Sequence, residues 1–451
     1  MSMSDYRRAA RAALLIVALP SCGALFLPAG EAQAATRTVT NCNDSGSGSL
    51  RAVAAGAASG DTIDLSRLTC SRITLTSGEI LLPQDNIRLL GRDRLALTIF
   101  GNRSSRVLHH TSTGKLTVER LTVSYGHVTN GGARGGCIAS TGDVTLRQSR
   151  AHHCVAEGLG GLEPTATGGA IQADGNIVLD RTSVFENIAE AQSDSYGGGV
   201  ASGGKTTLLR SQVYNNRGGY GGGVLTENGF RMVYSILQNN SASARGGGAN
   251  VRGDAEINKS TVSGNHATQS SGGIIFSDGP FAESVAVIAD STISGNSSSF
   301  GESALAFVSA EGEIYNSTIV FNHEYTTGTE CWGAVFNFGL HMESTVVSGN
   351  TCDGFDQRDL GGLPSAVDFV TGSHNIVGGA AQTMPPDTIF SSTPGLGPLA
   401  HNGGPTRTHA VLSGSILIDR GNNVLDRAYD QRGAPYPRLR GAAPDVGAFE
   451  R

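Results

Sequence analysis

Short runs of Val, Ile and Leu alternate with Ser and Thr along most of this chain, and Gly or Asn closes each run. Runs of about five such residues between turn residues predict strands. The clearest unit starts at a Gly-Gly corner, passes through two apolar runs and ends in Ser-x-(Val/Ile)-x-x-Asn. Three copies lie between Gly221 and Asn296, with corners at Gly221, Gly246 and Gly272. Repetition of this kind is the signature of a solenoid.

Matching asparagines extend the repeat in both directions, with steps of roughly 23 to 33 residues, which is a solenoid spacing. Two or three short strands and their turns fill one repeat, so each repeat predicts one coil of a parallel β-helix, with coils ~4.8 Å apart. Stacked asparagine side chains can hydrogen-bond to one another at the bend. The predicted ladder consists of Asn187, Asn216, Asn239, Asn265, Asn296, Asn322 and Asn350.

The pattern therefore predicts an all-β chain folded as a right-handed parallel β-helix, its handedness following the general preference of parallel crossovers. A short helix is expected before the coils, because Leu50, Val53, Ala54 and Ala57 share one helical face. Such a helix would cover the open edge of the first coil as an N-terminal cap. The expected order is a signal peptide over 1–35, a cap over 36–82, coils over 83–352, an irregular connection over 353–395 and a C-terminal block over 396–451.

The first 35 residues have the features of an export signal. Three arginines precede an apolar run over 12–19, and Ala32-Gln33-Ala34 is a small-residue cleavage site. Leu19-Pro20-Ser21-Cys22 resembles a lipoprotein box, so lipidation at Cys22 is left open. No later segment is long and apolar enough to span a bilayer. The expected location is extracellular, periplasmic or on the outer cell surface.

The amino-acid composition and net charge limit both the kind of core and the kind of binding partner that the chain can have. The chain has 63 glycines, 16% charged residues and a formal net charge of −6. Glycine at about twice its average usage and few charges suit a narrow core of small and β-branched side chains. A mildly acidic chain argues against nucleic acid as a partner.

Six cysteines follow the signal, an even number that suits disulfides in an oxidising compartment. They fall into three pairs of close neighbours, although six cysteines allow 15 pairings. Cys154 occupies the asparagine position of its coil, where a covalent link can replace a ladder hydrogen bond. The chain contains no C-x-x-C pair, so the spacing of the cysteines does not indicate a zinc site. The expected disulfides are Cys42–Cys70, Cys137–Cys154 and Cys331–Cys352.

The last 55 or so residues carry a distinct block, with Asp430-Gln431-Arg432-Gly433 and Asp445-Val446-Gly447-Ala448-Phe449-Glu450 as its densest parts. This block resembles the C-terminal block of the choice-of-anchor Q family, whose members are exported bacterial proteins with pectin-lyase-like right-handed β-helices. The resemblance implies the same fold and export. Family members often carry an anchoring tail after this glutamate, and here one residue follows it, so the resemblance supplies no anchor.

Candidate chemistry is sparse. Acidic residues recur just after the Gly-Gly corners, and Glu227, Asp254 and Asp278 are the predicted ligand-binding residues, because stacked coils could align them. Calcium is the cofactor that such acids would suit, and the sequence otherwise indicates none. The alternative is that these acids cap turns. The segment 199–206 matches a phosphate-loop pattern, but a strand pattern follows it where a helix is required, so no nucleotide site is predicted.

Two functions stay open on the sequence. The first is a non-catalytic surface or secreted scaffold that contacts glycans or other surface polymers, because a long repetitive face lacks a recognisable catalytic motif. The second is a divergent polysaccharide lyase or glycoside hydrolase acting on uronate-type polysaccharide. The second function predicts that acidic and basic side chains converge in one groove.

Overall fold

The computed structural model describes residues 34–277, 284–326, 331–337, 339–354, 358–361 and 370–451. Residues 34–451 form one compact unit. The predicted signal peptide, apart from its last two residues, Cys22 and Asp278 lie outside the described residues.

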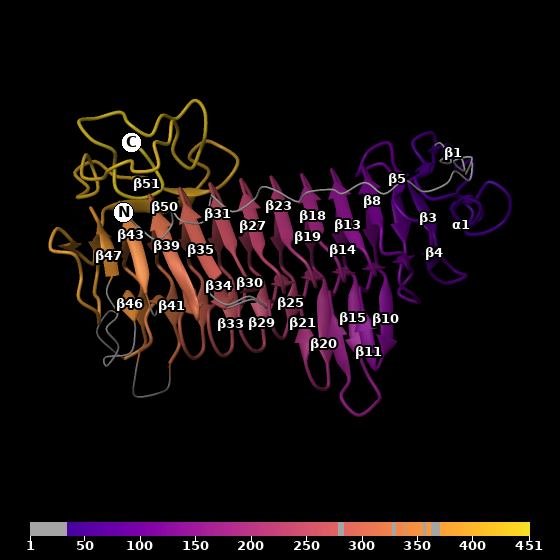
Figure 1. Ribbon diagram of the computed structural model, residues 1–451, viewed down its shortest axis with the longest axis horizontal. Helices are drawn as coiled ribbons and strands as arrows, with labels where there is room; N and C mark the ends of the chain where they lie inside the picture. The colour runs from indigo at the N-terminus through magenta and orange to yellow at the C-terminus, as the bar shows by residue number, and fades with distance from the viewer. Residues whose placement is uncertain (1–33, 278–283, 327–330, 338, 355–357, 362–369) are drawn as a thin grey trace, which may run out of the picture. The chain divides into compact units, whose positions relative to one another are not determined.

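The strands of this unit stack coil upon coil (Figure 1). A typical coil runs through β17 (Ile171–Ala173), β18 (Ile177–Asp180), β19 (Ser183–Phe185), β20 (Ile188–Ala191) and β21 (Ser195–Tyr196) and returns to the first sheet at β22 (Val200–Ser202). Every one of these strands pairs in parallel with its counterpart one coil away. This arrangement is a right-handed parallel β-helix, so the predicted fold class is confirmed.

The parallel sheets are named A to E. Sheet A contains β1 (Thr36–Thr38), β2 (Thr62–Asp64), β5 (Ile87–Leu90), β8 (Lys115–Glu119), β13 (Asp143–Arg147), β18 (Ile177–Asp180), β23 (Thr206–Leu209), β27 (Phe230–Val233), β31 (Ala255–Asn258), β35 (Ser284–Ala289), β39 (Ala310–Tyr315), β43 (Leu340–Glu343) and β47 (Val370–Ser373). Sheet B contains β3 (Arg72–Thr74), β6 (Thr98–Phe100), β9 (Thr122–Ser124), β14 (Arg150–His152), β19 (Ser183–Phe185), β24 (Gln212–Tyr214), β28 (Ile236–Gln238), β32 (Thr261–Ser263), β36 (Thr292–Ser294), β40 (Thr318–Val320), β44 (Val346–Ser348), β48 (Ile376–Val377) and β49 (Ile389–Phe390).

Sheet C contains β4 (Ile80–Leu82), β7 (Leu108–His110), β12 (Ile138–Ser140), β17 (Ile171–Ala173), β22 (Val200–Ser202), β26 (Val224–Thr226), β30 (Ala249–Arg252), β34 (Ile274–Ser277), β38 (Leu305–Val308), β42 (Val335–Phe336) and β46 (Leu360–Gly361). Sheet D contains β10 (His127–Asn130), β15 (Val155–Gly158), β20 (Ile188–Ala191), β25 (Arg217–Gly218), β29 (Ser241–Ala242), β33 (His266–Ala267), β37 (Ser297–Ser298), β41 (His323–Glu324) and β45 (Thr351–Cys352). The short sheet E contains β11 (Gly132–Arg134), β16 (Thr165–Thr167) and β21 (Ser195–Tyr196).

One helix precedes the coils, α1 (Leu50–Ala55), with Ser49 as its N-cap and Leu50 and Ala54 buried. The 36–82 segment also supplies β1 to β4, which pair with the coils that follow. The motif at 199–206 lies on β22, a Gly-Gly turn and the start of β23, so a strand follows it. At the other end, β50 (Leu396–Ala400) and β51 (Thr408–Val411) form an antiparallel hairpin.

Aliphatic side chains fill the inside of the coils. In sheet A the inward positions of β13 and β18 are Val144 and Ile177, and then Leu146 and Leu179, all fully buried. Their neighbours along each strand point outward, as the period of two in a strand requires. Stacked β-branched and leucine side chains therefore form a dry core along the coils.

An asparagine ladder joins the coils at the corner between sheets B and D. Asn216 shows its pattern: its Nδ2 donates to Asn240 Oδ1 at 2.9 Å and to the Val184 carbonyl at 3.1 Å, and its backbone N–H donates to Asn240 Oδ1 at 3.0 Å. The same bonds repeat through the fully buried residues Asn187, Asn216, Asn240, Asn265, Asn296, Asn322 and Asn350.

One predicted rung, Asn239, is wrong by one residue, and Asn240 takes its place. Asn239 occupies the left-handed position just before the rung, with φ of 52°, as Gly264 and Gly295 do in the next two coils. This bend turns the Asn239 side chain away from the coil interior and the following one inward. Two adjacent asparagines made the register ambiguous in the sequence.

A second ladder, which the sequence analysis did not predict, lies at the corner between sheets A and B. Here a buried hydroxyl accepts the backbone N–H of the preceding coil, as when Ser211 N donates to Ser235 Oγ at 3.1 Å. The hydroxyl belongs to the Ser of the Ser-x-(Val/Ile) repeat. The ladder runs through Ser149, Thr182, Ser211, Ser235, Ser260, Ser291, Ser317 and Thr345 and ends at Asn375.

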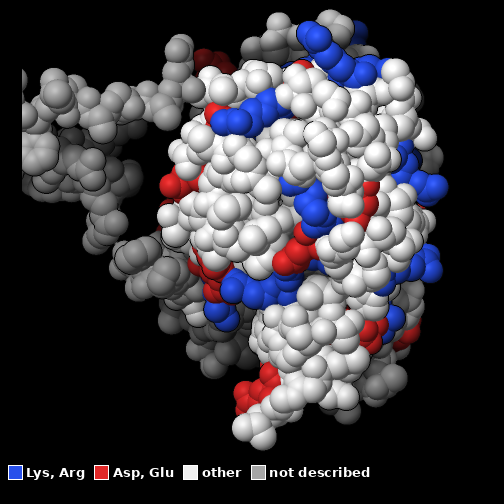
Figure 2. Space-filling view, turned by 90° about the vertical axis from the view of Figure 1, so that its right-hand side faces the viewer, with Lys and Arg blue, Asp and Glu red and all other residues white. Residues whose placement is uncertain are grey.

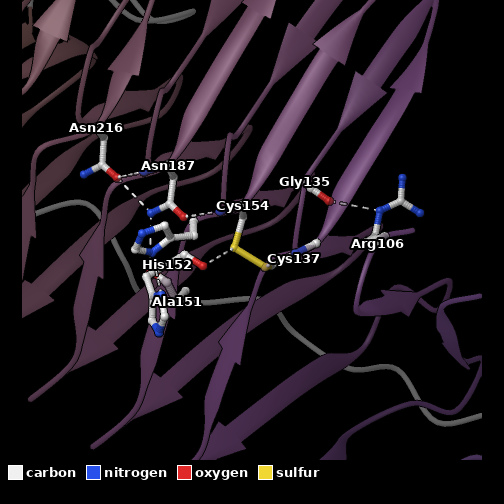
Figure 3. Close-up of a disulfide and its surroundings, with 10 residues drawn as sticks. Arg106, Gly135, Cys137, Ala151, His152, Cys154, Asn187 and Asn216 are labelled. Atoms are coloured by element: carbon white, nitrogen blue, oxygen red, sulfur yellow. Dashed lines mark hydrogen bonds between the residues drawn. A yellow bond between two sulfur atoms is a disulfide. The ribbon is translucent and has the colours of Figure 1, made fainter. Parts of the chain in front are cut away.

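All three predicted disulfides are confirmed: Cys42–Cys70, Cys137–Cys154 and Cys331–Cys352. Figure 3 shows that the Cys137–Cys154 bond lies at the start of the asparagine ladder, where Cys154 N donates to Asn187 Oδ1 at 3.0 Å. The cysteine therefore keeps the backbone bond of the ladder position, and its sulfur replaces the side-chain bond.

A buried carboxyl group ends the asparagine ladder. Asp359 Oδ1 accepts Asn350 Nδ2 at 2.6 Å and Asn350 N at 3.0 Å, while Asp359 Oδ2 has no hydrogen-bond partner among the described residues. Burial raises the pKa of Asp359 to about 6. The pKa of this carboxyl group is thus higher in the folded protein than in the unfolded chain. Its contribution to the free energy of unfolding is therefore fully present below the unfolded pKa and is lost as the pH rises through about 6.

Replacing Asp359 with Asn is therefore expected to have a pH-dependent effect. At about pH 3 the variant should match the parent in its free energy of unfolding, because the acid is then protonated, and as neutral as the amide, in both the folded and the unfolded protein. At pH 8 it should be more stable by about 1–3 kcal/mol, because no charge is buried. Chemical denaturation at the two pH values measures the difference, and equal effects at both would contradict the assignment.

The C-terminal block packs on the outer side of sheets A and B, over the later coils (Figure 1). Gln431 is its central contact: its Oε1 accepts Thr292 Oγ1 at 2.6 Å, and its Nε2 donates to the Ser260 carbonyl at 3.2 Å. Arg432 forms an ion pair with Asp430 and lies between the rings of Tyr436 and Phe449, 4.0 and 3.7 Å from their centres. The charged residues of this motif thus hold the block together and attach it to the coils.

Candidate functional site

A cavity lies on the outer face of sheet C. The central residue of each three-residue sheet C strand points away from the core, yet in β17, β22 and β26 these residues, Gln172, Ala201 and Leu225, are buried. They form the floor of a cavity of about 240 Å³. We call this region the sheet C groove.

One wall of the groove carries an ion pair. Arg134, at the end of β11, pairs with Asp174, which follows β17. Gln172 Nε2, on the floor, donates to Asp174 Oδ1 at 3.0 Å. The carboxylate is thus held by two donors, and all three side chains line the cavity.

A second pair lies two coils along. Arg252 Nη1 donates to Glu227 Oε2 at 2.7 Å, and Glu227 lines the cavity. Beside it the rings of Tyr196 and Tyr220 stack with their centres 5.4 Å apart, and Tyr196 also lines the cavity. Burial, the negative charge of the neighbouring Asp194 and a hydrogen bond to that carboxylate raise the pKa of Tyr196.

A third cluster lies on the same sheet face towards the N-terminus. Glu79 Oε1 bonds to His109 Nδ1 at 2.7 Å, and Glu79 Oε2 pairs with Arg106 Nη1 at 2.6 Å. Burial alone would raise the pKa of Glu79, but His109 and Arg106 bring it below its ordinary value. Arg106 Nε also donates to the Gly135 carbonyl at 3.0 Å, which joins this cluster to the strand end that carries Arg134 (Figure 3).

Charged side chains of both signs lie together elsewhere as well. Figure 2 shows the face at the end of the coils that carries α1, where lysine and arginine lie beside aspartate and glutamate in small mixed groups. Most of that face is uncharged. The arrangement differs from the single-sign patch that a nucleic-acid phosphate backbone would require.

The predicted ligand-binding residues meet different outcomes. Glu227 lines the groove, whereas Asp254 Oδ1 accepts the backbone N–H of Val285, in β35 of the next coil, at 3.1 Å and so ties two coils together. Asp278 lies outside the described residues. Within the described residues, no group of three metal-ligating side chains includes Glu227 or Asp254, so the row of acids expected for calcium does not form there.

Most groove residues were not predicted, namely Arg134, Gln172, Asp174 and Tyr196. They come from two coils and from both sides of sheet C, so no local motif contains them. Alignment of the coils with one another could have identified the floor of the groove. Gln172, Ala201 and Leu225 pair with one another in successive strands of sheet C, and their side chains all point outward.

No protein-family model and no curated protein sequence matches the chain. Among solved structures, the chain aligns with the crystal structure of pectate lyase Pel9A with a TM-score of 0.35 and 14% sequence identity, over 94% of this chain and 98% of that one. Within the described residues, no helix is long and apolar enough to cross a membrane.

Proposed function

We propose that the protein binds a polysaccharide chain along the sheet C groove. The observation that carries this proposal is the cavity over Gln172, Ala201 and Leu225, edged by side chains from successive coils. A glycan presents hydroxyl groups on its edges and apolar C–H groups on its faces. The guanidinium, carboxylate and amide groups of the groove suit the hydroxyls, and the Tyr196–Tyr220 stack offers an amphipathic wall.

The charge balance of the groove favours a neutral glycan over a uronate. Arg134 and Arg252 are each already paired with a carboxylate, Asp174 and Glu227. Neither arginine of these two pairs is left unpaired to bind the carboxylate of an acidic sugar. The two carboxylates would in addition repel an anionic chain. Hydroxyl groups, by contrast, can share hydrogen bonds with both members of each pair.

The proposal extends to location and family. Export to an oxidising compartment is supported by the three disulfides, and membership in the choice-of-anchor Q family is supported by the resemblance of the C-terminal block. In this proposal the protein is a scaffold that holds a glycan without cleaving it.

A glycan array followed by titration of the best ligand tests the proposal, with a matched pair of variants. Glu227→Gln in the groove should weaken binding at least about five-fold, which is the threshold of a significant contact. Glu256→Gln is the control, because Glu256 pairs with Arg231 on sheet A at 2.8 Å, much as Glu227 pairs with Arg252 at 2.7 Å. Equal effects of the two variants, or no ligand at all, would sink the proposal.

The second candidate, a polysaccharide-cleaving enzyme, is favoured by the Glu79–His109–Arg106 cluster. A carboxylate that orients a histidine is one arrangement that supports proton transfer. Incubating the protein with neutral and uronate polysaccharides and measuring new chain ends separates the candidates. Steady product release that His109→Gln abolishes would establish the enzyme and overturn the scaffold.

A further inference from the structure

A buried acidic site lies in the coil of β41, away from the sheet C groove. Glu324 is fully buried, and Glu302 beside it is nearly so. The two carboxyl groups repel each other, and among the described residues neither forms an ion pair, although Arg245 acts on Glu302 from a distance. Two buried acids without a paired cation are unusual, because such charges are normally paired or bind a metal ion.

The bonds of the two acids differ. Glu302 Oε2 accepts Ser270 Oγ at 2.6 Å. Glu324 Oε2 accepts the Trp332 backbone N–H at 2.9 Å, whereas Glu324 Oε1 has no hydrogen-bond partner in the described part of the chain. Glu324 thus has an unused ligand atom inside the protein.

Two sulfur atoms complete the site. The Sγ atom of Cys331 lies 3.6 Å from Glu324 Oε2. A carboxylate oxygen of Glu324 and the Sγ atoms of Cys331 and Cys352 all lie within 4.8 Å of one another. The two sulfurs form a disulfide, so in this state they are not available as metal ligands.

We infer that Cys331, Cys352 and Glu324 form a zinc site that opens when the Cys331–Cys352 disulfide is reduced. Two thiolates and one carboxylate are a donor set that suits Zn²⁺, and three protein ligands leave a fourth position for water. The ion would also neutralise the otherwise unpaired Glu324.

The chemistry balances with a thiol reductant. Two thiol molecules reduce the Cys331–Cys352 bond, become a disulfide themselves and leave two protein thiols. Zinc then binds both sulfurs, and two protons pass to solvent. The disulfide formed from the reductant can reverse the step: it is reduced to two thiols, the Cys331–Cys352 bond forms again and the ion is released.

The other two disulfides serve as internal controls. Within the described residues, the group of Glu324, Cys331 and Cys352 is the only one that brings three metal-ligating side chains together. Reduction of Cys42–Cys70 or Cys137–Cys154 therefore exposes thiols without a carboxylate placed to join them.

Zinc titration by calorimetry on the full chain tests the inference, before and after reduction with a phosphine under anaerobic conditions. One Zn²⁺ should bind per reduced chain and none per oxidised chain. The double variant Cys331→Ser/Cys352→Ser, reduced in the same way, should lose this binding although the four thiols of the other two disulfides remain. Glu324→Gln, which keeps both thiols and the side-chain shape, should weaken binding at least about ten-fold.

Cobalt provides a second measurement, whose first readout uses the wild-type protein alone. Reduced wild-type protein should give a thiolate-to-cobalt charge-transfer band, and Glu324→Gln should shift or weaken it. Absence of zinc binding by reduced protein that keeps its native circular dichroism would overturn the inference. Equal binding by the wild type and the Cys331→Ser/Cys352→Ser variant would do the same.

Discussion

Replacing Asn240 with Ala is expected to lower the free energy of unfolding by about 2–4 kcal/mol, because it leaves several buried polar groups without partners. Asn240 Oδ1 accepts both the backbone N–H and the Nδ2 of Asn216, at 3.0 and 2.9 Å. Asn240 Nδ2 donates to the Val213 carbonyl at 3.0 Å and to Asn265 Oδ1 at 2.9 Å. Alanine would remove all four bonds and leave a cavity too small to restore them. Guanidinium denaturation gives the change.

The adjacent asparagine supplies the control. Asn239→Gly should change the free energy of unfolding by less than about 0.5 kcal/mol, as is usual for surface changes. Glycine fits there without strain, because Gly264 and Gly295 hold the same left-handed position in the next two coils. A larger loss at Asn239 than at Asn240 would restore the register first predicted from the sequence.

The Asp290→Asn variant is expected to release the C-terminal block, at a cost of about 3–5 kcal/mol, which is typical of a broken buried ion pair. Asp290 Oδ1 accepts Arg438 Nη2 at 2.7 Å, and both side chains are buried. Lys259 and Arg427 lie 3.7 and 3.6 Å from Asp290 Oδ2. Asparagine keeps the shape and the left-handed backbone but removes the negative charge that three cations share.

Limited proteolysis and hydrogen exchange measure this release. The segment 396–451 should become cleavable and lose amide protection, whereas β14 to β24 of sheet B should keep their protection. Asp180→Asn is the control, because Asp180 is a partly exposed acid whose nearest cation, Arg181, is 3.8 Å away. If both variants leave the block protected, the ion cluster is not what holds it.

The coil repeat could be predicted because it depends on residue types a few positions apart. Strand runs, Gly-Gly corners and a closing asparagine recur within each repeat, and each cysteine pair lies within 28 residues. Where two asparagines stood together, at Asn239 and Asn240, composition alone could not fix the register. The backbone bend decided it.

The groove and the C-terminal contacts could not be predicted in the same way, since their partners are far apart in the sequence. Arg134 and Asp174 are separated by 40 residues, and Arg438 meets Asp290 across 148. Both pairs depend on how many residues each intervening coil contains. Asp254 could be named from the sequence, but its role could not, because an acid at a corner can accept a backbone N–H as readily as it can bind a ligand.

The C-terminal block touches several coils at once, through Lys259, Thr292, Thr318 and Ser344. Each uncovered coil, by contrast, is bonded mainly to its two neighbours, with a few side-chain contacts that reach further, such as Arg94 to the Arg181 carbonyl. Under tension applied along the axis, the early coils should peel off one after another at low force. Unfolding should then stop near Lys259 until a higher force is reached, and the later coils should unfold together in one large step. The C-terminal block would thus give the later half of the solenoid a higher mechanical stability.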